Sequence, residues 1–162
     1  MRLRYLFLIF TVIIMLTSCQ VADADNPDKP FPGAVLIGEK VVLFPEEKFD
    51  NKYIVYPEDG HWTPSAEDII ALEEKIVEYL QENAHLFEYE PWKSFDEYYY
   101  RQYAGYTYEG RYMIYGNYIC GTSGFNWTRD MILGSDGGEC FVQIKYDVEN
   151  GTFTEIRVNG EA

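Results

Sequence analysis

The strongest periodic pattern of apolar residues lies in the middle of the chain and predicts a helix. Four apolar residues recur there at helical spacing: Ile69, Leu72, Ile76 and Leu80. Thr63 is the expected N-cap, Pro64 fits the first helical position, and Asn83 suits the end of the helix. The polar side of the helix is acidic rather than basic, with Glu73, Glu74 and Glu78, which favours a helix packed on a core over a basic helix that binds membranes.

Alternation of apolar and polar residues near the C-terminus predicts a half-buried strand. The even positions from 142 to 148 are apolar or aromatic, and the odd positions are polar. Two turns at Asn150-Gly151 compete for the hairpin that follows. A two-residue type I′ turn would set Arg157 opposite Ile144. A three-residue loop, with Gly151 in the left-handed conformation, pairs apolar residues instead: Ile144 with Ile156 and Val142 with Val158. We expect this second register.

The alternation of even and odd positions also predicts which segment pairs with the other edge of this strand. If Cys120 lies opposite Cys140, then Tyr118 faces Val142, and the even positions of both strands share one inner face. A rival arrangement is a hairpin of Thr128–Leu133 with residues 139–142, which would insert a further strand. Both arrangements stay open on the sequence alone.

Three shorter apolar segments, at residues 34–37, 41–44 and 53–56, are bounded by Gly, Pro or charge and are typical of short strands. Together the patterns predict an α+β fold, with one amphipathic helix packed on an antiparallel sheet of four or more strands. On architecture alone, this resembles the cystatin shape, in which a sheet wraps one helix.

The N-terminus carries an export signal. Arg2 and Arg4 precede an apolar run of about ten residues, which is too short to span a bilayer. The run ends in Leu16-Thr17-Ser18-Cys19, which resembles the lipobox of bacterial lipoproteins. The resemblance implies that cleavage falls before Cys19 and that Cys19 is diacylated. An ordinary secretory signal, with Cys19 left as a free thiol, is the alternative.

This reading divides the chain into three parts. Residues 1–18 are the lipoprotein signal peptide, residues 19–33 are the lipidated cysteine and a flexible tether with three prolines, and residues 34–162 form a single globular domain. Gln20 stands where an inner-membrane retention signal would have Asp. Resemblance to lipoprotein sorting therefore implies a lipid-anchored protein of the cell envelope, at the outer membrane.

The charge of the chain restricts its partners. The 162 residues include 27 acidic and 13 basic side chains, a formal net charge of −14. Such a surface repels nucleic acid and anionic headgroups, so we expect no nucleic-acid partner and a membrane contact through the lipid anchor alone.

Cysteine and histidine usage argues against metal chemistry. Cys120 and Cys140 remain as an even pair in an oxidising location, which favours a disulfide over a metal site or reactive thiols. His61 and His85 have no metal-like spacing to them. We expect no metal, no cofactor and no catalytic residues, because neither a nucleophile elbow nor a zinc-binding helix motif is present.

A second resemblance covers residues 101–162. It rests on three segments: Arg101-Gln102-Tyr103-Ala104-Gly105, Asp136-Gly137-Gly138-Glu139-Cys140-Phe141 and Asn159-Gly160-Glu161-Ala162. They resemble a group of small bacterial lipoproteins, many from Bacteroidota-type genomes, which carry RQYxG, DGGxCxF and NGxA segments. In this chain Phe141 directly follows the cysteine. The resemblance implies a shared fold and no assigned activity.

Tyrosine supplies the best hint of a binding surface, because nine tyrosines lie between residues 98 and 118. We expect an exposed set of them to form a binding face: Tyr99, Tyr103 and Tyr115, with Arg101 beside them. Arg101 either anchors a carboxylate ligand or packs on aromatic rings and pairs with a carboxylate of the chain; the second is favoured. Asp136-Gly137-Gly138 and Asn150-Gly151 are expected to be turns rather than ligand loops.

These observations give three hypotheses of function. The leading one is a lipid-anchored, non-catalytic binding or accessory module with a protein or glycan partner. The second is a small protease-inhibitor-like or scaffold lipoprotein, and the least favoured is a hydrolase that uses carboxylates.

Overall fold

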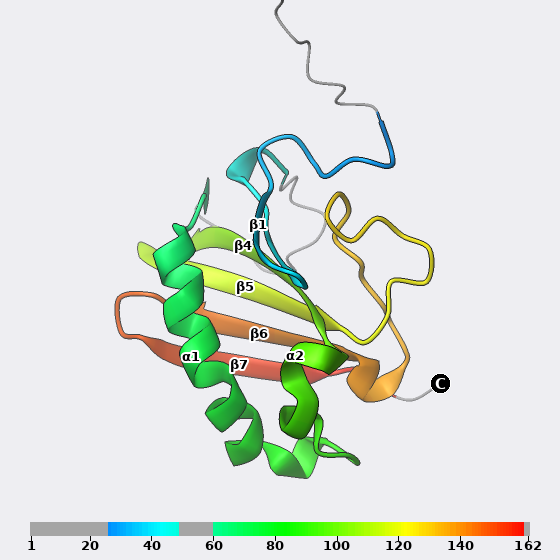
Figure 1. The fold of residues 1–162 in the computed structure, drawn as a ribbon. Coiled ribbons are helices and arrows are strands. Elements are labelled where there is room, and N and C mark those ends of the chain that lie inside the picture. Colours follow the sequence, from blue (N-terminus) through cyan, green and yellow to red (C-terminus); the bar gives the residue numbers. More distant parts are fainter. Residues whose placement is uncertain (1–25, 49–59, 161–162) are drawn as a thin grey trace, which may run out of the picture.

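A computed structural model describes residues 26–48 and 60–160 of the chain. Its strands form one mostly antiparallel sheet, and helix α1 lies across one face of it (Figure 1). The strands are β1 (Val35–Gly38), β2 (Val41–Leu43), β3 (Gly60–Trp62), β4 (Tyr100–Tyr108), β5 (Arg111–Ile119), β6 (Phe141–Asp147) and β7 (Thr152–Val158). The helices are α1 (Ala66–Glu82) and α2 (Phe95–Tyr98), with single 3-10 turns η1 (Glu46–Lys48), η2 (Ala84–Leu86), η3 (Pro91–Ser94) and η4 (Gly138–Cys140). The predicted α+β class is confirmed.

The strand order is β1-β2-β4-β5-β6-β7, and β3 pairs with β4 beside β2. β2 runs parallel to the first half of β4, whereas β3 runs antiparallel to its second half. Two short strands therefore share one edge of β4, and the sheet is not purely antiparallel as the pattern had suggested. The first two short apolar segments form β1 and β2, and the predicted strand at residues 53–56 lies outside the described residues.

Helix α1 buries the four residues that its period predicted, and all four are fully buried. Its N-cap is Ser65 rather than Thr63, because Ser65 and Asp68 form a capping box: each side chain accepts from the backbone N–H of the other residue. The Thr63 hydroxyl instead accepts from the backbone N–H of Glu46 at 3.0 Å. Asn83 ends the helix, as predicted, and its side chain donates to the Tyr79 carbonyl.

The expected pairing of β6 with β7 is confirmed, since Ile144 pairs with Ile156 and Val142 with Val158. The loop differs from the expected three residues. Asp147 pairs with Thr152, which leaves a four-residue loop, and a bulge in β7 restores the register. Gly151 has a φ of +63°, and the described positive-φ residues do not include Asn150, so the turn is not type I′.

The pairing of β5 with β6 also follows the predicted parity: Tyr118 pairs with Val142 and Gly116 with Ile144. Cys120 and Cys140 form the disulfide, with Cα atoms 4.8 Å apart. A crosslink of this loop length contributes about 3 kcal/mol by the chain-entropy model. The rival hairpin is wrong, because Thr128–Leu133 forms no strand.

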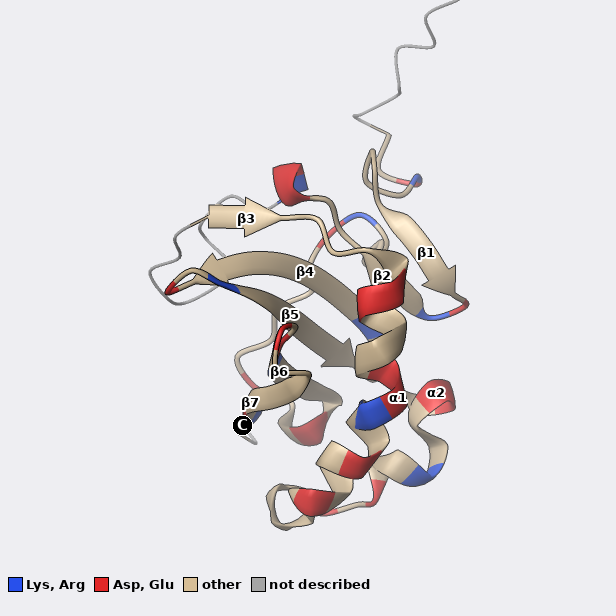
Figure 2. Cartoon of the chain, turned by 90° about the vertical axis from the view of Figure 1, so that its left-hand side faces the viewer, with Lys and Arg blue, Asp and Glu red and all other residues tan. Residues whose placement is uncertain are grey.

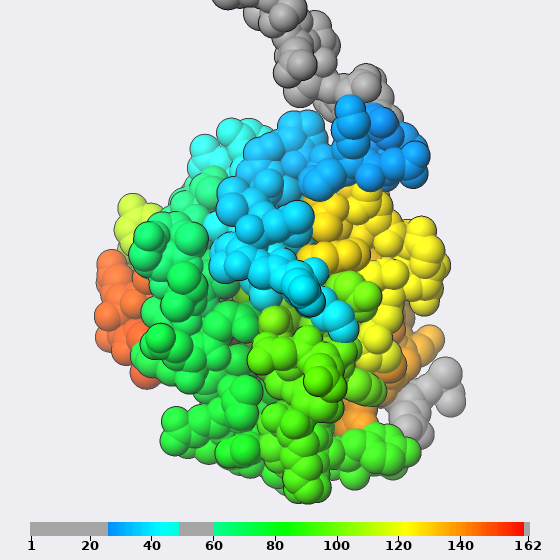
Figure 3. All heavy atoms as spheres, in the orientation of Figure 1, coloured from blue at the N-terminus to red at the C-terminus, as the bar shows by residue number. Residues whose placement is uncertain are grey.

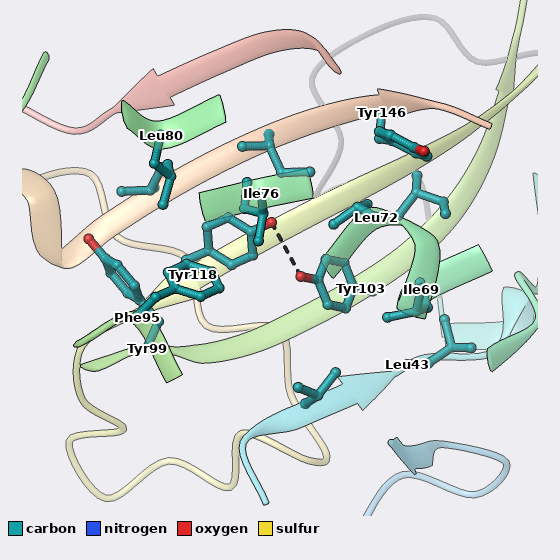
Figure 4. Packing of buried hydrophobic residues seen from close by; sticks show 14 residues of the cluster. Leu43, Ile69, Leu72, Ile76, Leu80, Phe95, Tyr99, Tyr103, Tyr118 and Tyr146 are labelled. Carbon is teal, nitrogen blue, oxygen red and sulfur yellow. Dashed lines mark hydrogen bonds between the residues drawn. The ribbon is translucent and has the colours of Figure 1, made fainter. Parts of the chain in front are cut away.

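The sheet has a core on each face. The face toward α1, which we call the helix face, holds the larger cluster, drawn in Figure 4. The opposite face, the loop face, is covered over β4 and β5 by residues 120–140. Buried Gln102 donates to the carbonyls of Trp127 and Asp130 at 2.7 and 2.8 Å, and buried Asn117 donates to the Ile132 carbonyl at 2.8 Å. These bonds satisfy the carbonyls of the long loop and hold it on the sheet.

Residues 26–33, expected to be part of a flexible tether, contact the domain. The Asn126 side chain donates to the carbonyls of Pro27 and Lys29, at 2.8 and 3.1 Å. The backbone N–H of Phe31 donates to the Thr128 carbonyl at 3.0 Å, and its ring packs on the core of the loop face. The packed domain therefore begins before residue 34.

The left-handed conformation of Gly151 generates a prediction. Gly151→Ala should lower the free energy of unfolding by about 1 kcal/mol, because a Cβ is disfavoured at this φ. The matched control is Gly160→Ala, where φ is not positive and nothing lies within 4 Å of the added Cβ; it should stay within about 0.5 kcal/mol of wild type. Urea denaturation measures both, and equal losses would contradict the turn assignment.

Candidate functional site

The residues expected to form an exposed binding face lie in the interior. Tyr99 and Tyr103 are fully buried, and only 7% of Tyr115 and 5% of Arg101 are exposed. β4 and β5 are central strands, and the middle residues of both strands are buried on both faces, so neither parity there faces solvent. An exposed face built from these four side chains is therefore wrong.

Arg101 lies in an ion-paired cluster on the helix face. Its Nη1 donates to Asp96 of α2 at 2.5 Å, and its Nε lies 3.4 Å from Oε1 of Glu73 on α1. The guanidinium carbon is 5.0 Å from the centre of the Phe95 ring. Arg101 thus connects β4 to both helices, and its charge is occupied by carboxylates of its own chain.

The tyrosines of this cluster hydrogen-bond one another. Tyr103 donates to Glu73, and the hydroxyl oxygens of Tyr103 and Tyr118 lie 3.2 Å apart (Figure 4). Burial raises the pKa of both tyrosines well above the usual range. Burial also raises the pKa of Glu73, although the Arg101 charge opposes the shift. The cluster is closed to a ligand and holds the helix face together.

The segment Arg101–Gly105 has a structural role, and Gly105 is the clearest case. A Cβ at Gly105 would lie 2.4 Å from the carbonyl oxygen of Trp62, so a side chain there would displace β3. The side chains of Arg101 and Tyr103 make ion pairs and core contacts on the helix face. Gln102 hydrogen-bonds residues 120–140 on the loop face, so the segment has structural contacts on both faces of the sheet.

The glycines of Asp136-Gly137-Gly138 form a turn in which both have positive φ, +97° and +57°. The turn leads into η4, which places Cys140 at its disulfide and leaves Glu139 half-buried near Tyr98. The Tyr99 hydroxyl donates to the Glu139 carbonyl at 2.7 Å. This bond connects the end of α2 to η4.

A hollow of about 260 Å³ opens between α2, η4 and the chain that follows α1. We call it the tyrosine hollow. The residues that line it are Leu86, Glu88, Tyr89, Tyr98, Gly137, Gly138, Glu139, Cys140, Val158 and Asn159. The segment of residues 86–98, drawn green, lies against the orange segment near residue 140 at the lower end of the molecule (Figure 3). At this hollow, apolar side chains such as Leu86 and Val158 lie beside the carboxylates of Glu88 and Glu139.

Two tyrosines at this hollow are open to solvent. Tyr89 is 70% exposed and Tyr98 is 37% exposed, whereas Tyr99, the next residue after Tyr98, is fully buried. The Tyr98 ring packs edge-to-face on buried Tyr99, with centroids 4.8 Å apart, which fixes its position. The hollow therefore presents aromatic area on an ordered support.

Glu139 brings a negative charge close to these rings. Its Oε2 accepts from the backbone N–H of Tyr89 at 3.4 Å, and its Oε1 is buried and has no hydrogen-bond partner among the described residues. Burial and the charge of Glu139 raise the pKa of Tyr98. The negative charge of Glu139 therefore acts on the Tyr98 hydroxyl at the hollow.

A second hollow, of about 290 Å³, lies on the loop face beside Arg111 and Lys145. Its cations already have carboxylate partners: Arg111 is 3.2 Å from Asp147, and Lys145 is 2.7 Å from Glu155. Because these charges are paired within the chain, the second hollow offers a ligand fewer charged groups to bind than the tyrosine hollow does.

Comparison with protein-family models, curated proteins and solved structures found no match to this chain. In residues 26–48 and 60–160, no three His, Cys, Asp or Glu side chains are grouped so that they could hold a metal ion. None of the helices in these ranges has the length and apolar character needed to cross a membrane.

Sequence reasoning missed Tyr89, Glu88 and Glu139 as candidate site residues. Tyr89 lies between two glutamates outside the tyrosine-rich segment, and Glu139 occupies the unspecified position of the DGGxC pattern. The signal that could have pointed to Tyr89 was an aromatic residue directly flanked by Glu88 and Glu90.

The raised pKa of Glu73 generates a prediction for the pH dependence of stability. The folded protein holds the Glu73 proton to higher pH than the unfolded chain does, so this group's contribution to stability is greatest below its unfolded pKa and is lost as pH rises through the folded pKa. From pH 4 to 7, the free energy of unfolding of wild type should fall relative to that of Glu73→Gln.

Glu74→Gln, an exposed neighbour on the same helix, is the matched control. Denaturant titrations at each pH measure the three proteins. Parallel curves for wild type and Glu73→Gln would show that Glu73 does not titrate in this way.

Proposed function

We propose that this protein is a lipid-anchored, non-catalytic binding module of the cell envelope. The apolar run that ends in Leu16-Thr17-Ser18-Cys19 supports the anchor, because the cysteine stands where the lipobox carries its lipid. The acidic surface supports a membrane contact made by acyl chains rather than by protein charge. Gln20 supports sorting to the outer membrane.

The binding site of this module is the tyrosine hollow. The observation that carries the proposal is the pair of solvent-open tyrosines, Tyr89 and Tyr98, around a concave surface that also holds the Glu139 carboxylate. Tyrosine gives large contact area at low entropic cost, and a nearby polar group fixes orientation. The partner is an envelope component that presents one side chain or one sugar ring to the hollow.

The other two hypotheses receive less support from the arrangement. The two carboxylates of the helix-face cluster, Glu73 and Asp96, are both paired with Arg101, so they do not present a free carboxylate pair to a substrate. An inhibitor would need apolar loops at one end of the sheet, and the described hairpin tips carry Glu109, Gly110, Glu149 and Asn150. We therefore do not propose either activity.

Replacement of Cys19 tests the anchor. Wild type should sediment with membranes and incorporate a palmitate analogue, whereas Cys19→Ser should be soluble or remain an uncleaved, unlabelled precursor. A Cys120→Ser/Cys140→Ser double variant should keep the label, which controls for general loss of cysteine. Unchanged labelling of Cys19→Ser would refute the anchor, and recovery with inner-membrane markers in a sucrose gradient would refute the sorting.

Site-specific photocrosslinking in living cells tests the hollow. Tyr98→p-benzoylphenylalanine should give one discrete adduct, whereas the same replacement of Tyr112, which is 48% exposed and outside the hollow, should not. Excess mature chain carrying Cys19→Ser should compete the adduct away, and the same competitor with Tyr89→Ala should compete at least about tenfold less well. Equal adducts at both positions, or equal competition by both chains, would contradict the proposal.

A further inference from the structure

The tyrosine hollow has a charge of one sign. Glu88 and Glu139 line it, and the described residues of its lining include no Lys, Arg or His. The surrounding chain is also acidic: α1 and α2 carry many more acidic than basic residues, drawn red and blue (Figure 2). A concave surface with such a potential concentrates cations and repels anions.

Glu139 offers an unused acceptor in this potential. Its Oε1 is buried and has no hydrogen-bond partner among the described residues, although Oε2 accepts from Tyr89. Oε1 is shielded from solvent, so a ligand in the hollow would meet the charge of the whole carboxylate rather than this oxygen alone. The described lining of the hollow holds no Lys, Arg or His that could pair with this charge, and a cationic N–H donor would form a strong hydrogen bond with the carboxylate.

The tyrosines complete a surface for such a donor. Tyr89 and Tyr98 border the same hollow as Glu139, and both rings are open to solvent. An ammonium group near the face of an aromatic ring is attracted by its quadrupole, and the alkyl chain behind it gains apolar contact with Leu86 and Val158.

We infer that the tyrosine hollow binds an alkylammonium group, with Glu139 as its acceptor and Tyr89 and Tyr98 as its aromatic walls. The inference rests on the proposed binding function and names the ligand chemistry of that site. A volume of about 260 Å³ accommodates one extended amine rather than a folded segment. A free diamine and the side chain of a lysine supply the same group.

Titration with 1,5-diaminopentane tests the ligand chemistry, with 1,5-pentanediol as the neutral match. The protein is the mature chain with Cys19→Ser, observed by NMR chemical shifts at residues of the hollow. The diamine should bind with a Kd on the order of 1 mM, and the diol at least about tenfold more weakly. A capped Ala-Lys-Ala peptide and its norleucine analogue repeat the comparison, and the better ligand of the two amines identifies the source.

Two matched variants locate the acceptor. Glu139→Gln should weaken diamine binding about tenfold or more, because the charge-assisted bond is lost. Glu149→Gln removes the same charge from an exposed residue of the β6–β7 loop, outside the hollow, and should leave Kd within about twofold. For the aromatic walls, Tyr89→Leu should weaken binding about two- to tenfold, and Tyr89→Phe should retain it.

Three results would overturn the inference: no binding of either amine at 10 mM, equal binding of diamine and diol, or equal losses in Glu139→Gln and Glu149→Gln. These outcomes are distinguishable from failure of the proposed function. If photocrosslinking still detects a partner at the hollow, the proposed binding function is retained and only the proposed alkylammonium ligand is rejected. If neither experiment detects a ligand, both proposals fall together.

Discussion

The ion pairs of Arg101 hold three elements of this domain in place. A central strand supplies the guanidinium, and α1 and α2 supply the carboxylates of Glu73 and Asp96. Because a largely buried guanidinium without its partners is costly, the pairing constrains where α2 can lie. α2 in turn sets Tyr98 at the hollow and leads into Tyr99, which hydrogen-bonds η4. The geometry of the candidate site therefore depends on a charge cluster that does not touch a ligand.

The residues of the second resemblance belong mostly to this support. Arg101 and Gly105 govern packing around β4, while Gly137 and Cys140 set the turn and its crosslink. Glu139 lies between Gly138 and Cys140 of this turn and lines the hollow. The residues that shape the turn are therefore distinct from the carboxylate that the hollow presents.

The sequence predicted those parts of the fold that depend on local period. The helix period gave the buried residues of α1, and strand parity gave the partners of Ile144 and Tyr118. The burial of the tyrosines was not predictable in this way. Parity says which residues share a face, but not that residues 120–140 return to cover the second face and bury Tyr115. The hollow depends on two segments about 50 residues apart, Tyr89 and Glu139, and no periodic signal links them.

The contacts of Asn126 with Pro27 and Lys29 have a consequence for where the domain can travel. With residues from Pro27 onward held against the body, only seven peptide units separate Cys19 from Asn26, a reach of at most about 25 Å. If Cys19 carries the lipid, this short linker keeps the domain close to the bilayer surface, and the protein diffuses in the plane of the membrane. The described chain begins, in blue, at the upper end of the molecule in Figure 1, and α2 lies in the lower half. With such an anchor, the hollow would lie on the part of the domain away from its point of attachment.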